Sequence, residues 1–306
     1  MGIEETLWEF DPHTLAKHKI LKKYIEARAA ILGSRDNVGR IVYIDGFSGP
    51  GEDKSHKFLG SPLIALDALI NHRLFNNINA NIQMLFIEER KDRIEHLETV
   101  IKNKFPNIPD KIKYTLIEGE FNSVMKMILD DLEKENKRLP PTFCFVDPFG
   151  WSDLNLEILA RFMKQEKAEL LITFMAGPMR RSINNDAQYD ILKGFLDENQ
   201  IEEAKSKHGE ERANYLAEKF LNKLKGNIPK EVYDVSFKTF DKNNNVLYFL
   251  IYLTSHRVGM KVMKEAMYYT STYGEFYFND FEFDPEQTTL VDYGINSTWY
   301  QNAANE

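Results

Sequence analysis

Residues 41–51 read Ile41-Val42-Tyr43-Ile44-Asp45-Gly46-Phe47-Ser48-Gly49-Pro50-Gly51, and this stretch decides the fold. An apolar run ends in an acid and then breaks into a glycine-rich turn. A buried parallel strand has this composition when it leads into a loop whose backbone a ligand can approach closely. The glycines are not spaced as in the dinucleotide fingerprint G-x-G-x-x-G, because here the order is D-G-x-x-G-x-G.

The order of acid and glycines resembles the first motif of S-adenosylmethionine-dependent methyltransferases. The resemblance implies that S-adenosylmethionine is the cofactor and that Asp45 lies near its methionine amino group. It also implies that Gly46, Phe47, Gly49 and Gly51 give the cofactor room beside the backbone. The alternative is a glycine turn that only packs a helix, which is common after strands.

Composition limits the possible classes of protein. A chain of 306 residues with 43% hydrophobic residues can bury one large core or two modest ones. Its one cysteine, Cys144, excludes an internal disulfide and a cysteine-rich metal site. No apolar run is long enough to span a bilayer and the first residues lack the pattern of a signal peptide, so we expect a cytoplasmic protein without a membrane partner.

Charge argues against a broad nucleic-acid surface. The net charge is −8, which disfavours non-specific binding to phosphates but allows a local basic groove. One basic cluster lies near the start of the chain, and its members are Lys17, Lys19, Lys22, Lys23 and Arg28. We interpret this cluster mainly as a solvated helix face. His13 and His18 lie in the same segment without a metal-ligand pattern, and we expect no metal site.

Apolar strand runs alternate with amphipathic helices as far as residue 174. The predicted strands are residues 40–45, 82–88, 113–118, 142–147 and 169–174. The predicted helices are residues 12–32, 61–70, 89–104, 121–137 and 153–163. The strand runs do not alternate between apolar and polar residues, which predicts a parallel sheet covered by helices on both faces.

The alternation of predicted strands and helices ends after residue 174. Residues 175–230 are polar and helical, and two β-rich runs follow at 232–240 and 246–254. Their connection is too short for a crossover helix, so the two runs should form an antiparallel hairpin. Five alternating units and a hairpin give the strand count of the methyltransferase-like sheet.

The predicted fold is therefore α/β: a doubly wound, mostly parallel, seven-stranded Rossmann-like sheet with an antiparallel last strand. We divide the chain into an N-terminal helical segment (1–39), a methyltransferase-like domain (40–270, with a helical insertion at about 175–230) and a C-terminal β extension and tail (271–306). The extension is predicted from alternating aromatic residues, which are Phe276, Phe278, Phe281 and Phe283.

Ligands of open α/β sheets bind outside the carboxyl ends of the strands. The second strand ends at Glu88, which could accept hydrogen bonds from ribose hydroxyl groups. The third strand is followed by Glu120 and Phe121, which could bind and stack on an adenine base. Each acid could instead cap the helix that follows it, because acids are stabilised at a helix start.

The fourth strand leads into Asp147-Pro148-Phe149-Gly150-Trp151. Methyltransferases of amino groups on nucleobases carry an acid or amide, two prolines and an aromatic residue at this place. The resemblance implies that Asp147 and Pro148 accept hydrogen bonds from the target amine and that Phe149 stacks on its plane, with Trp151 as a second stacking face. This chain lacks the second proline. The alternative is a tight turn in which Phe149 fills the core.

Several ordered stretches together resemble the three-Cys-motif partner family (TcmP). They are Leu7-Trp8-Glu9-Phe10-Asp11-Pro12-His13-Thr14 with Lys17-His18, then residues 43–51, Gly60-Ser61-Pro62-Leu63, residues 145–151, Tyr252-Leu253-Thr254, Gly259 and Met263. The resemblance covers roughly the first 270 residues. It implies a bacterial or archaeal protein with a methyltransferase-like core, encoded beside a three-cysteine-motif protein that resembles radical-type iron–sulfur enzymes.

Two functions follow. The first is an S-adenosylmethionine-dependent methyltransferase acting on a planar nitrogen of a nucleobase, nucleotide or nucleic acid; its sulfonium donor is already activated, so no metal is needed. The second is a non-catalytic module that binds the three-cysteine-motif iron–sulfur protein or a nucleic acid. The fold alone does not distinguish the two.

Overall fold

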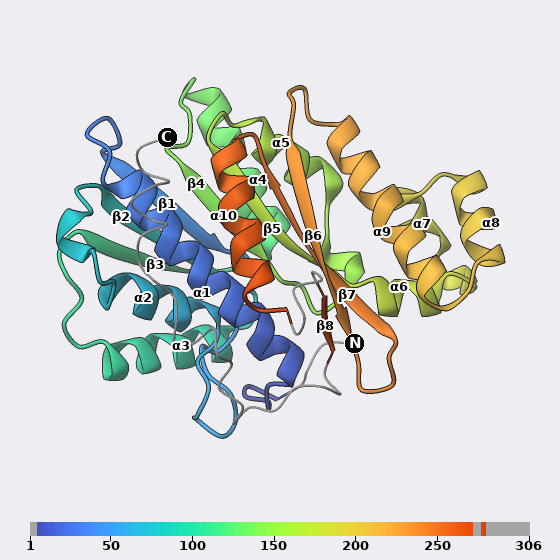
Figure 1. Cartoon of the computed structure of the whole chain (residues 1–306), viewed down its shortest axis with the longest axis horizontal. Helices are drawn as coiled ribbons and strands as arrows, with labels where there is room; N and C mark the ends of the chain where they lie inside the picture. Colours follow the sequence, from blue (N-terminus) through green and yellow to red (C-terminus); the bar gives the residue numbers. More distant parts are fainter. Residues whose placement is uncertain (1–4, 272–276, 280–306) are drawn as a thin grey trace.

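One eight-stranded sheet organises the molecule in the computed structural model, which describes residues 5–271 and 277–279 (Figure 1). The strand order is β3-β2-β1-β4-β5-β7-β6-β8. The strands are β1 (Arg40–Asp45), β2 (Asn81–Glu88), β3 (Ile112–Glu118), β4 (Thr142–Val146), β5 (Ala168–Phe174), β6 (Tyr233–Phe240), β7 (Val246–Thr254) and β8 (Tyr277–Asn279).

Helices cover both faces of this sheet. They are α1 (Pro12–Gly33), α2 (Ser61–Ile70), α3 (Lys91–Lys104), α4 (Phe121–Lys134), α5 (Leu156–Lys164), α6 (Ala176–Ser182), α7 (Tyr189–Phe195), α8 (Glu198–Ser206), α9 (Gly209–Gly226) and α10 (Arg257–Tyr268), with short 3₁₀ turns at Phe75–Asn77, Trp151–Asp153 and Asp186–Gln188. None of the helices within residues 5–271 is long and apolar enough to cross a membrane.

The pairing of the strands confirms the predicted fold class. Strands β1 to β5 pair in parallel, with β1 between β2 and β4. Strand β7 runs antiparallel to β6, as the short hairpin connection predicts, and it also pairs antiparallel with β5. The sheet also gains β8, which pairs in parallel with β6 and contains Phe278. Phe276, Phe281 and Phe283, which belong to the same predicted alternation, lie outside the described residues.

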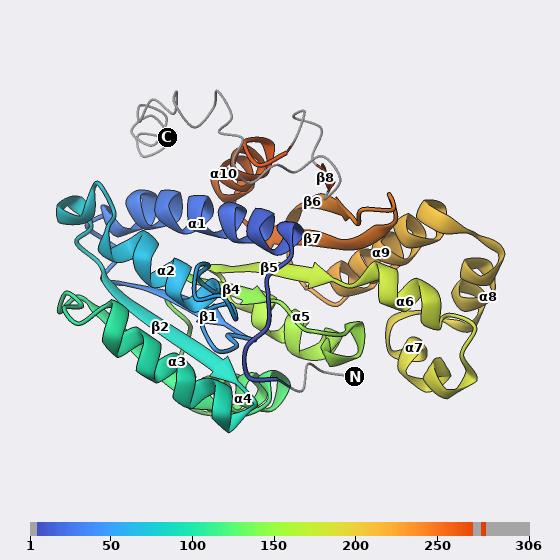
Figure 2. The same ribbon diagram turned by 90° about the horizontal axis from the view of Figure 1, so that it is seen from below.

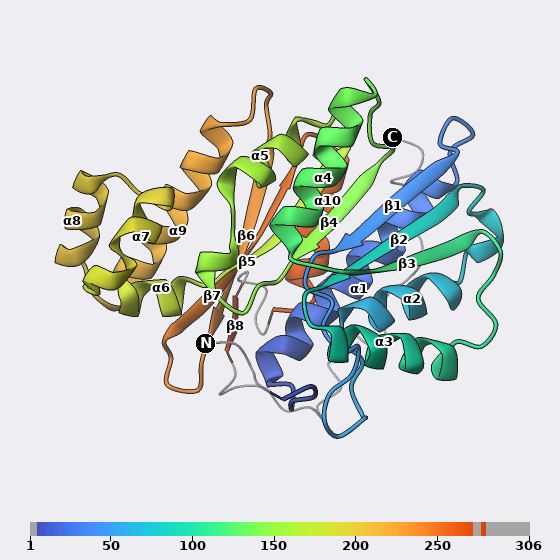
Figure 3. The same ribbon diagram turned by 180° about the vertical axis from the view of Figure 1, so that it is seen from behind.

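Side chains of alternate residues in the central strands pack into two separate cores, one on each face of the sheet. In β4, Phe143 and Phe145 belong to the core under α1, α2, α3 and α10, whereas Cys144 and Val146 belong to the core under α4, α5 and the inserted helices. Figure 2 shows α1 and α10 above the sheet, and Figure 3 shows α4 and α5 on the opposite face. Burial on both faces explains why the strand sequences are continuously apolar.

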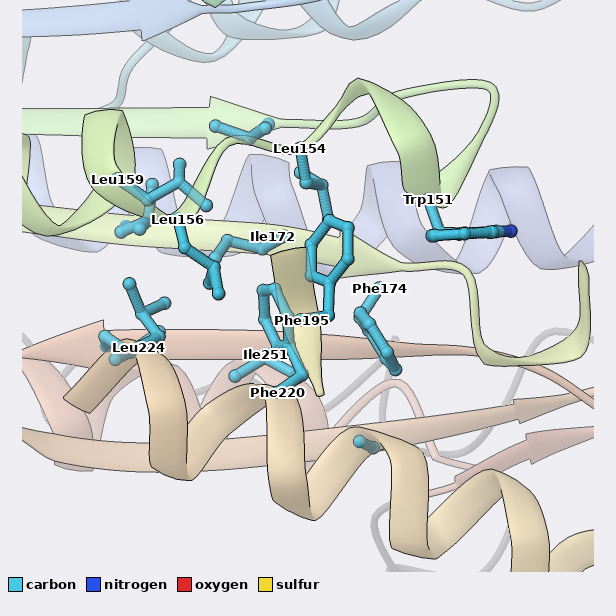
Figure 4. Close-up of a cluster of buried hydrophobic side chains, with 14 of the residues drawn as sticks. Trp151, Leu154, Leu156, Leu159, Ile172, Phe174, Phe195, Phe220, Leu224 and Ile251 are labelled. Atoms are coloured by element: carbon cyan, nitrogen blue, oxygen red, sulfur yellow. The ribbon is translucent and has the colours of Figure 1, made fainter. Parts of the chain in front are cut away.

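The helical insertion shares the second core. The ring of Phe220 on α9 stacks on Phe174 of β5 with ring centroids 4.5 Å apart, and Phe195 of α7 lies 6.1 Å from Phe220 (Figure 4). Phe220 and Phe174 are fully buried. The insertion is therefore attached to the sheet by aromatic packing.

Three predicted boundaries were wrong. Strand β4 ends at Val146 and not at Asp147, which leaves Asp147 in the loop. Helix α5 begins at Leu156 and not at residue 153, because the side chain of Asn155 accepts hydrogen bonds from the amides of Glu157 and Ile158 and caps the helix. Helix α4 ends at Lys134, since Asn136 adopts a left-handed conformation (φ 50°).

Replacing Phe220 by alanine tests the attachment of the insertion. Phe220→Ala should lower the free energy of unfolding by about 3–5 kcal/mol, because it removes a fully buried ring and leaves a cavity beside Phe174. Met127→Ala, at a side chain that is 56% exposed, should change it by less than about 0.5 kcal/mol. Urea denaturation measures both, and equal effects would contradict a shared core.

Candidate functional site

The glycine loop after β1 lies at the carboxyl edge of the parallel strands. Backbone hydrogen bonds hold it to the strands on both sides. The amide of Gly46 donates to the carbonyl of Phe145 at 2.8 Å, and the amide of Ser48 donates to the carbonyl of Ile87 at 2.9 Å. The loop therefore has a fixed position between the ends of β4 and β2.

Two glycines of this loop adopt backbone conformations that disfavour other residues. Gly49 has φ +60° and Gly51 has φ +90°. A Cβ on Gly51 would also lie 2.6 Å from the side chain of Leu97, whereas a Cβ on Gly49 would meet only the ring of Trp8, at 3.4 Å. Gly51 is needed for packing against α3, and Gly49 for the turn itself.

Two cavities flank the loop, and both are lined by Phe47 and Phe149. The larger has a volume of about 470 Å³, and its polar lining includes Glu88, Glu120, Asn122 and Arg93. The smaller has a volume of about 230 Å³. Its lining includes Lys17, His18, Gly49, Gly51, Asp147, Pro148 and Thr173. Two adjoining cavities on one sheet edge can hold two ligand groups next to each other.

Glu88 is the central polar group of the larger cavity. Its side chain is buried, and its two oxygens accept hydrogen bonds from the amides of Gly49 (3.0 Å) and Arg90 (2.9 Å). Burial raises the pKa of this carboxyl group. A carboxylate has about four acceptor positions, so about two remain for a ligand.

The start of α4 forms the other end of this cavity. Glu120 is exposed and accepts hydrogen bonds from Ser123 Oγ (2.6 Å) and Asn122 Nδ2 (3.1 Å), which lower its pKa. Phe121 is buried beneath the loop, where a Cβ on Gly46 would touch its ring at 2.6 Å.

Asn122 is a site residue that the sequence analysis missed. Its Nδ2 donates to Glu120 and to the carbonyl of Asp153, while its Oδ1 is buried without a hydrogen-bond partner. An unsatisfied buried acceptor beside a cavity suits a ligand that donates a hydrogen bond. In the sequence, the only indication that Asn122 belongs to the site is that it is a polar residue directly after Phe121.

Asp45 lies behind the loop and lines neither cavity. Its side chain is fully buried; Oδ2 accepts a hydrogen bond from Tyr43 Oη at 3.1 Å and Oδ1 has no partner. Burial raises the pKa of Asp45 to about 7, although hydrogen bonds from Ser61 and Tyr43 oppose this shift.

An ion pair between α1 and the fourth strand's loop forms the polar wall of the smaller cavity. Lys17 Nζ lies 2.7 and 2.5 Å from the two carboxylate oxygens of Asp147. Only 8% of the Lys17 side chain is exposed, so its assignment to a solvated helix face was wrong. Arg28 was also wrongly assigned to that face, because it is buried beside Glu169. Lys17 keeps Asp147 paired with a positive charge.

Two residues that line the same cavity each have a buried polar atom without a hydrogen-bond partner. His18 Nδ1 and Thr173 Oγ1 are both buried and make no hydrogen bond. Burial and the neighbouring Lys17 lower the pKa of His18 to about 3, so its imidazole is neutral. His18 was not predicted to belong to the site, although it lies in the stretch that carries the family resemblance.

Aromatic residues form the wall between the site and solvent. Phe149 is 41% exposed, and its ring lies edge-on to Trp8 at 5.4 Å. The guanidinium group of Arg93 lies 4.9 Å from the Trp8 ring and 5.2 Å from the Phe149 ring. Trp151 was expected to be a second stacking face, but it is buried against Phe195 and cannot serve this purpose.

Comparison with solved structures finds proteins of low sequence identity. The first is Trm1 from Pyrococcus horikoshii with S-adenosyl-L-methionine, at 12% identity and TM-score 0.46, matching 88% of this chain and 61% of that one. An O-methyltransferase from Bacillus cereus has 11% identity and TM-score 0.41, with 76% and 80% of the two chains matched. A human methyltransferase 10 domain containing protein has 14% identity and TM-score 0.34, with 76% and 81% matched. No protein-family profile and no curated protein matches the chain.

Asp45 should make stability depend on pH. Its folded pKa of about 7 lies above the ordinary value of 3.8, so between these values the folded state binds a proton that the unfolded state lacks. This group therefore lowers the free energy of unfolding by about 1.4 kcal/mol for each unit that pH rises through this window.

Asp45→Asn removes this titration. Relative to the wild type, the variant should become progressively more stable from pH 4 to pH 7, as measured by chemical denaturation at each pH. Asp36→Asn, at an exposed carboxylate, is the matched control and should follow the wild-type profile. Parallel profiles for Asp45→Asn and the wild type would show that Asp45 is ionised throughout.

Proposed function

We propose that this chain is an S-adenosylmethionine-dependent methyltransferase that acts on a planar nitrogen of a nucleobase, nucleotide or nucleic acid. One observation carries the proposal: the glycine loop, tied to Glu88 through the Gly49 amide, lies between two adjoining cavities at the carboxyl edge of the sheet. In open α/β sheets this edge is where ligands bind.

The larger cavity fits the nucleoside part of the cofactor. Its volume of about 470 Å³ lies within the range of about 300–1,000 Å³ that small-molecule sites occupy. The remaining acceptor positions of Glu88 suit two ribose hydroxyl groups, and the unpaired Oδ1 of Asn122 suits the amino group of adenine. Phe47, which lines both cavities, would border the path from the nucleoside to the reacting methyl group.

The smaller cavity fits the acceptor. The half-exposed ring of Phe149 offers a stacking surface for a planar group. Asp147 still has acceptor positions beside Lys17, and with the carbonyl of Pro148 it would orient an amino group so that its lone pair faces the methyl donor.

The cofactor supplies an activated methyl group, and the acceptor nitrogen must lose a proton. Methyl transfer would form an N–C bond as the S–C bond of the sulfonium breaks and leaves a neutral thioether; the nitrogen would then carry a positive charge until its N–H proton is lost. His18 is neutral and has an unpartnered Nδ1 in the same cavity, so it would accept a hydrogen bond from the N–H group of the acceptor and orient it; with a pKa of about 3 it is a weak base, and the proton would leave to water.

A second candidate is a non-catalytic partner of a three-cysteine-motif iron–sulfur protein. The ordered stretches that resemble the three-Cys-motif partner family support this proposal, and so does the Lys17–Asp147 ion pair, because Asp147 is already bound by a cation. Under this proposal the two cavities and the N-terminal segment serve association and not turnover.

Cofactor binding is tested by thermal unfolding. S-adenosylmethionine should raise the melting temperature, because a ligand that binds only the folded state stabilises it, whereas NADH should not. Gly49→Val should abolish the increase, since valine is strained at φ +60° in the loop that holds Glu88. Gly39→Val is the matched control, because a Cβ there meets nothing within 4 Å. An increase with NADH alone would contradict the assignment.

The role of Asp147 is tested by methyl-transfer assays with nucleic acids and nucleotides. Asp147→Ala should slow the reaction by roughly 10- to 150-fold, the equivalent of a lost charged hydrogen bond of about 1.5–3 kcal/mol, with little change in cofactor affinity. Asp147→Asn keeps an acceptor and should retain measurable activity.

Because Asp147→Ala leaves Lys17 buried without its partner, its folding must be checked by thermal unfolding. A folded Asp147→Ala protein that binds the cofactor and loses only its association with the three-cysteine-motif protein would favour the partner function.

A further inference from the structure

A buried polar network lies at the opposite edge of the sheet from the candidate site. Glu169, near the start of β5, accepts hydrogen bonds on Oε1 from the hydroxyl groups of Tyr24 and Tyr252, each at 2.9 Å. Its Oε2 accepts a hydrogen bond from Arg28 Nε. Helix α10 approaches closely through Gly259, where a Cβ would lie 2.6 Å from Glu169 Oε1. No part of the proposed methyl transfer uses this network.

Arg28 has a donor that the network leaves unused. Only 7% of this residue is exposed, and its Nη2 is buried without a hydrogen-bond partner. An unsatisfied charged donor in the interior is costly, so a native protein usually satisfies it with a ligand or another group. Glu169 balances the charge of Arg28 but leaves Nη2 free.

Arg28 and Glu169 line a cavity of about 150 Å³. The remaining wall is largely apolar, and its members are Ile31, Leu32, Val38, Pro141, Val258 and Val262. An apolar cavity of about this size holds a single benzene ring. The site therefore combines a compact apolar volume with one unsatisfied cationic donor.

The start of α10 supplies further donors. This helix has 12 residues, and its N-cap, His256, makes no side-chain cap hydrogen bond. The first bond within the helix runs from the amide of Met260 to the carbonyl of His256, which leaves the amides of Val258 and Gly259 without helical partners. His256, Val258 and Gly259 all border the cavity, and a helix start favours negative charge.

We propose that this cavity binds a small organic carboxylate with a compact apolar body, of the size of a phenyl group. The carboxylate would accept hydrogen bonds from Arg28 Nη2 and from the free amides at the start of α10, while the apolar part fills the cavity. Arg35 and Lys167, both exposed and both lining the cavity, add positive charge at its entrance. A neutral amide of the same shape would lose the charge-dependent part of this binding.

Isothermal titration of the full chain with benzoate and with benzamide tests the proposal, in the absence of S-adenosylmethionine. Benzoate should bind, and benzamide should bind at least tenfold more weakly. Failure of benzoate to bind at tens of millimolar, or equal binding of benzamide, would overturn the proposal. Neither result depends on methyl transfer, so this experiment and the tests of the proposed function can fail independently of each other.

Variants locate the bound benzoate. Val258→Phe fills the cavity from the first turn of α10 and should weaken benzoate binding at least tenfold, whereas Val258→Ala should preserve it. The double variant Arg35→Gln/Lys167→Gln changes only exposed side chains and should weaken benzoate binding about threefold or more. It tests the same site if Val258→Phe fails to fold. Lys126→Gln, an exposed cation on α4, is the matched control and should bind as the wild type does. Unchanged binding in both Val258→Phe and the double variant would overturn the assignment.

Discussion

The ion pair between Lys17 and Asp147 is the interaction on which the candidate site depends. It joins two residues that are 130 positions apart and fixes the N-terminal helix against the carboxyl edge of the sheet. Through it, α1 brings Lys17 and His18 into the smaller cavity. A buried charge that loses its partner is strongly destabilising, so the pair also keeps α1 and the loop after β4 in one relative position.

The sheet provides the second constraint. Parallel strands bring their carboxyl ends to one edge, and polar residues placed there cannot pack into the apolar layers above and below. Asp45 and Glu88 show two outcomes of this placement. Glu88 lines a cavity and can accept further hydrogen bonds from a ligand, whereas Asp45 is fully buried behind the loop and its pKa is raised to about 7. Neighbouring acids of one edge can therefore have different functions.

The opposite edge has a different chemistry. There, Arg28 and Glu169 line a small, largely apolar cavity and belong to a buried network with two tyrosines. The start of α10, which has no side-chain cap, borders the same cavity. The two edges share helix α1, which supplies Lys17 to one and Arg28 to the other. One helix thus places a buried cation at each end of the sheet, and each cation is paired with an acid from a strand or from the loop after a strand.

The sequence by itself determined the parallel direction of β1 to β5, the antiparallel hairpin of β6 and β7, the glycine loop, and the position of Glu88 and Asp147 near one edge. Apolar runs and short connections act locally, so they can be recognised in a linear chain. Only the tertiary structure decided that Lys17 pairs with Asp147, that Asn122 has a free acceptor, and that Trp8 packs on Phe149. These arrangements depend on contacts between distant segments, and their energies come from burial and pairing in three dimensions, which a local sequence pattern does not specify.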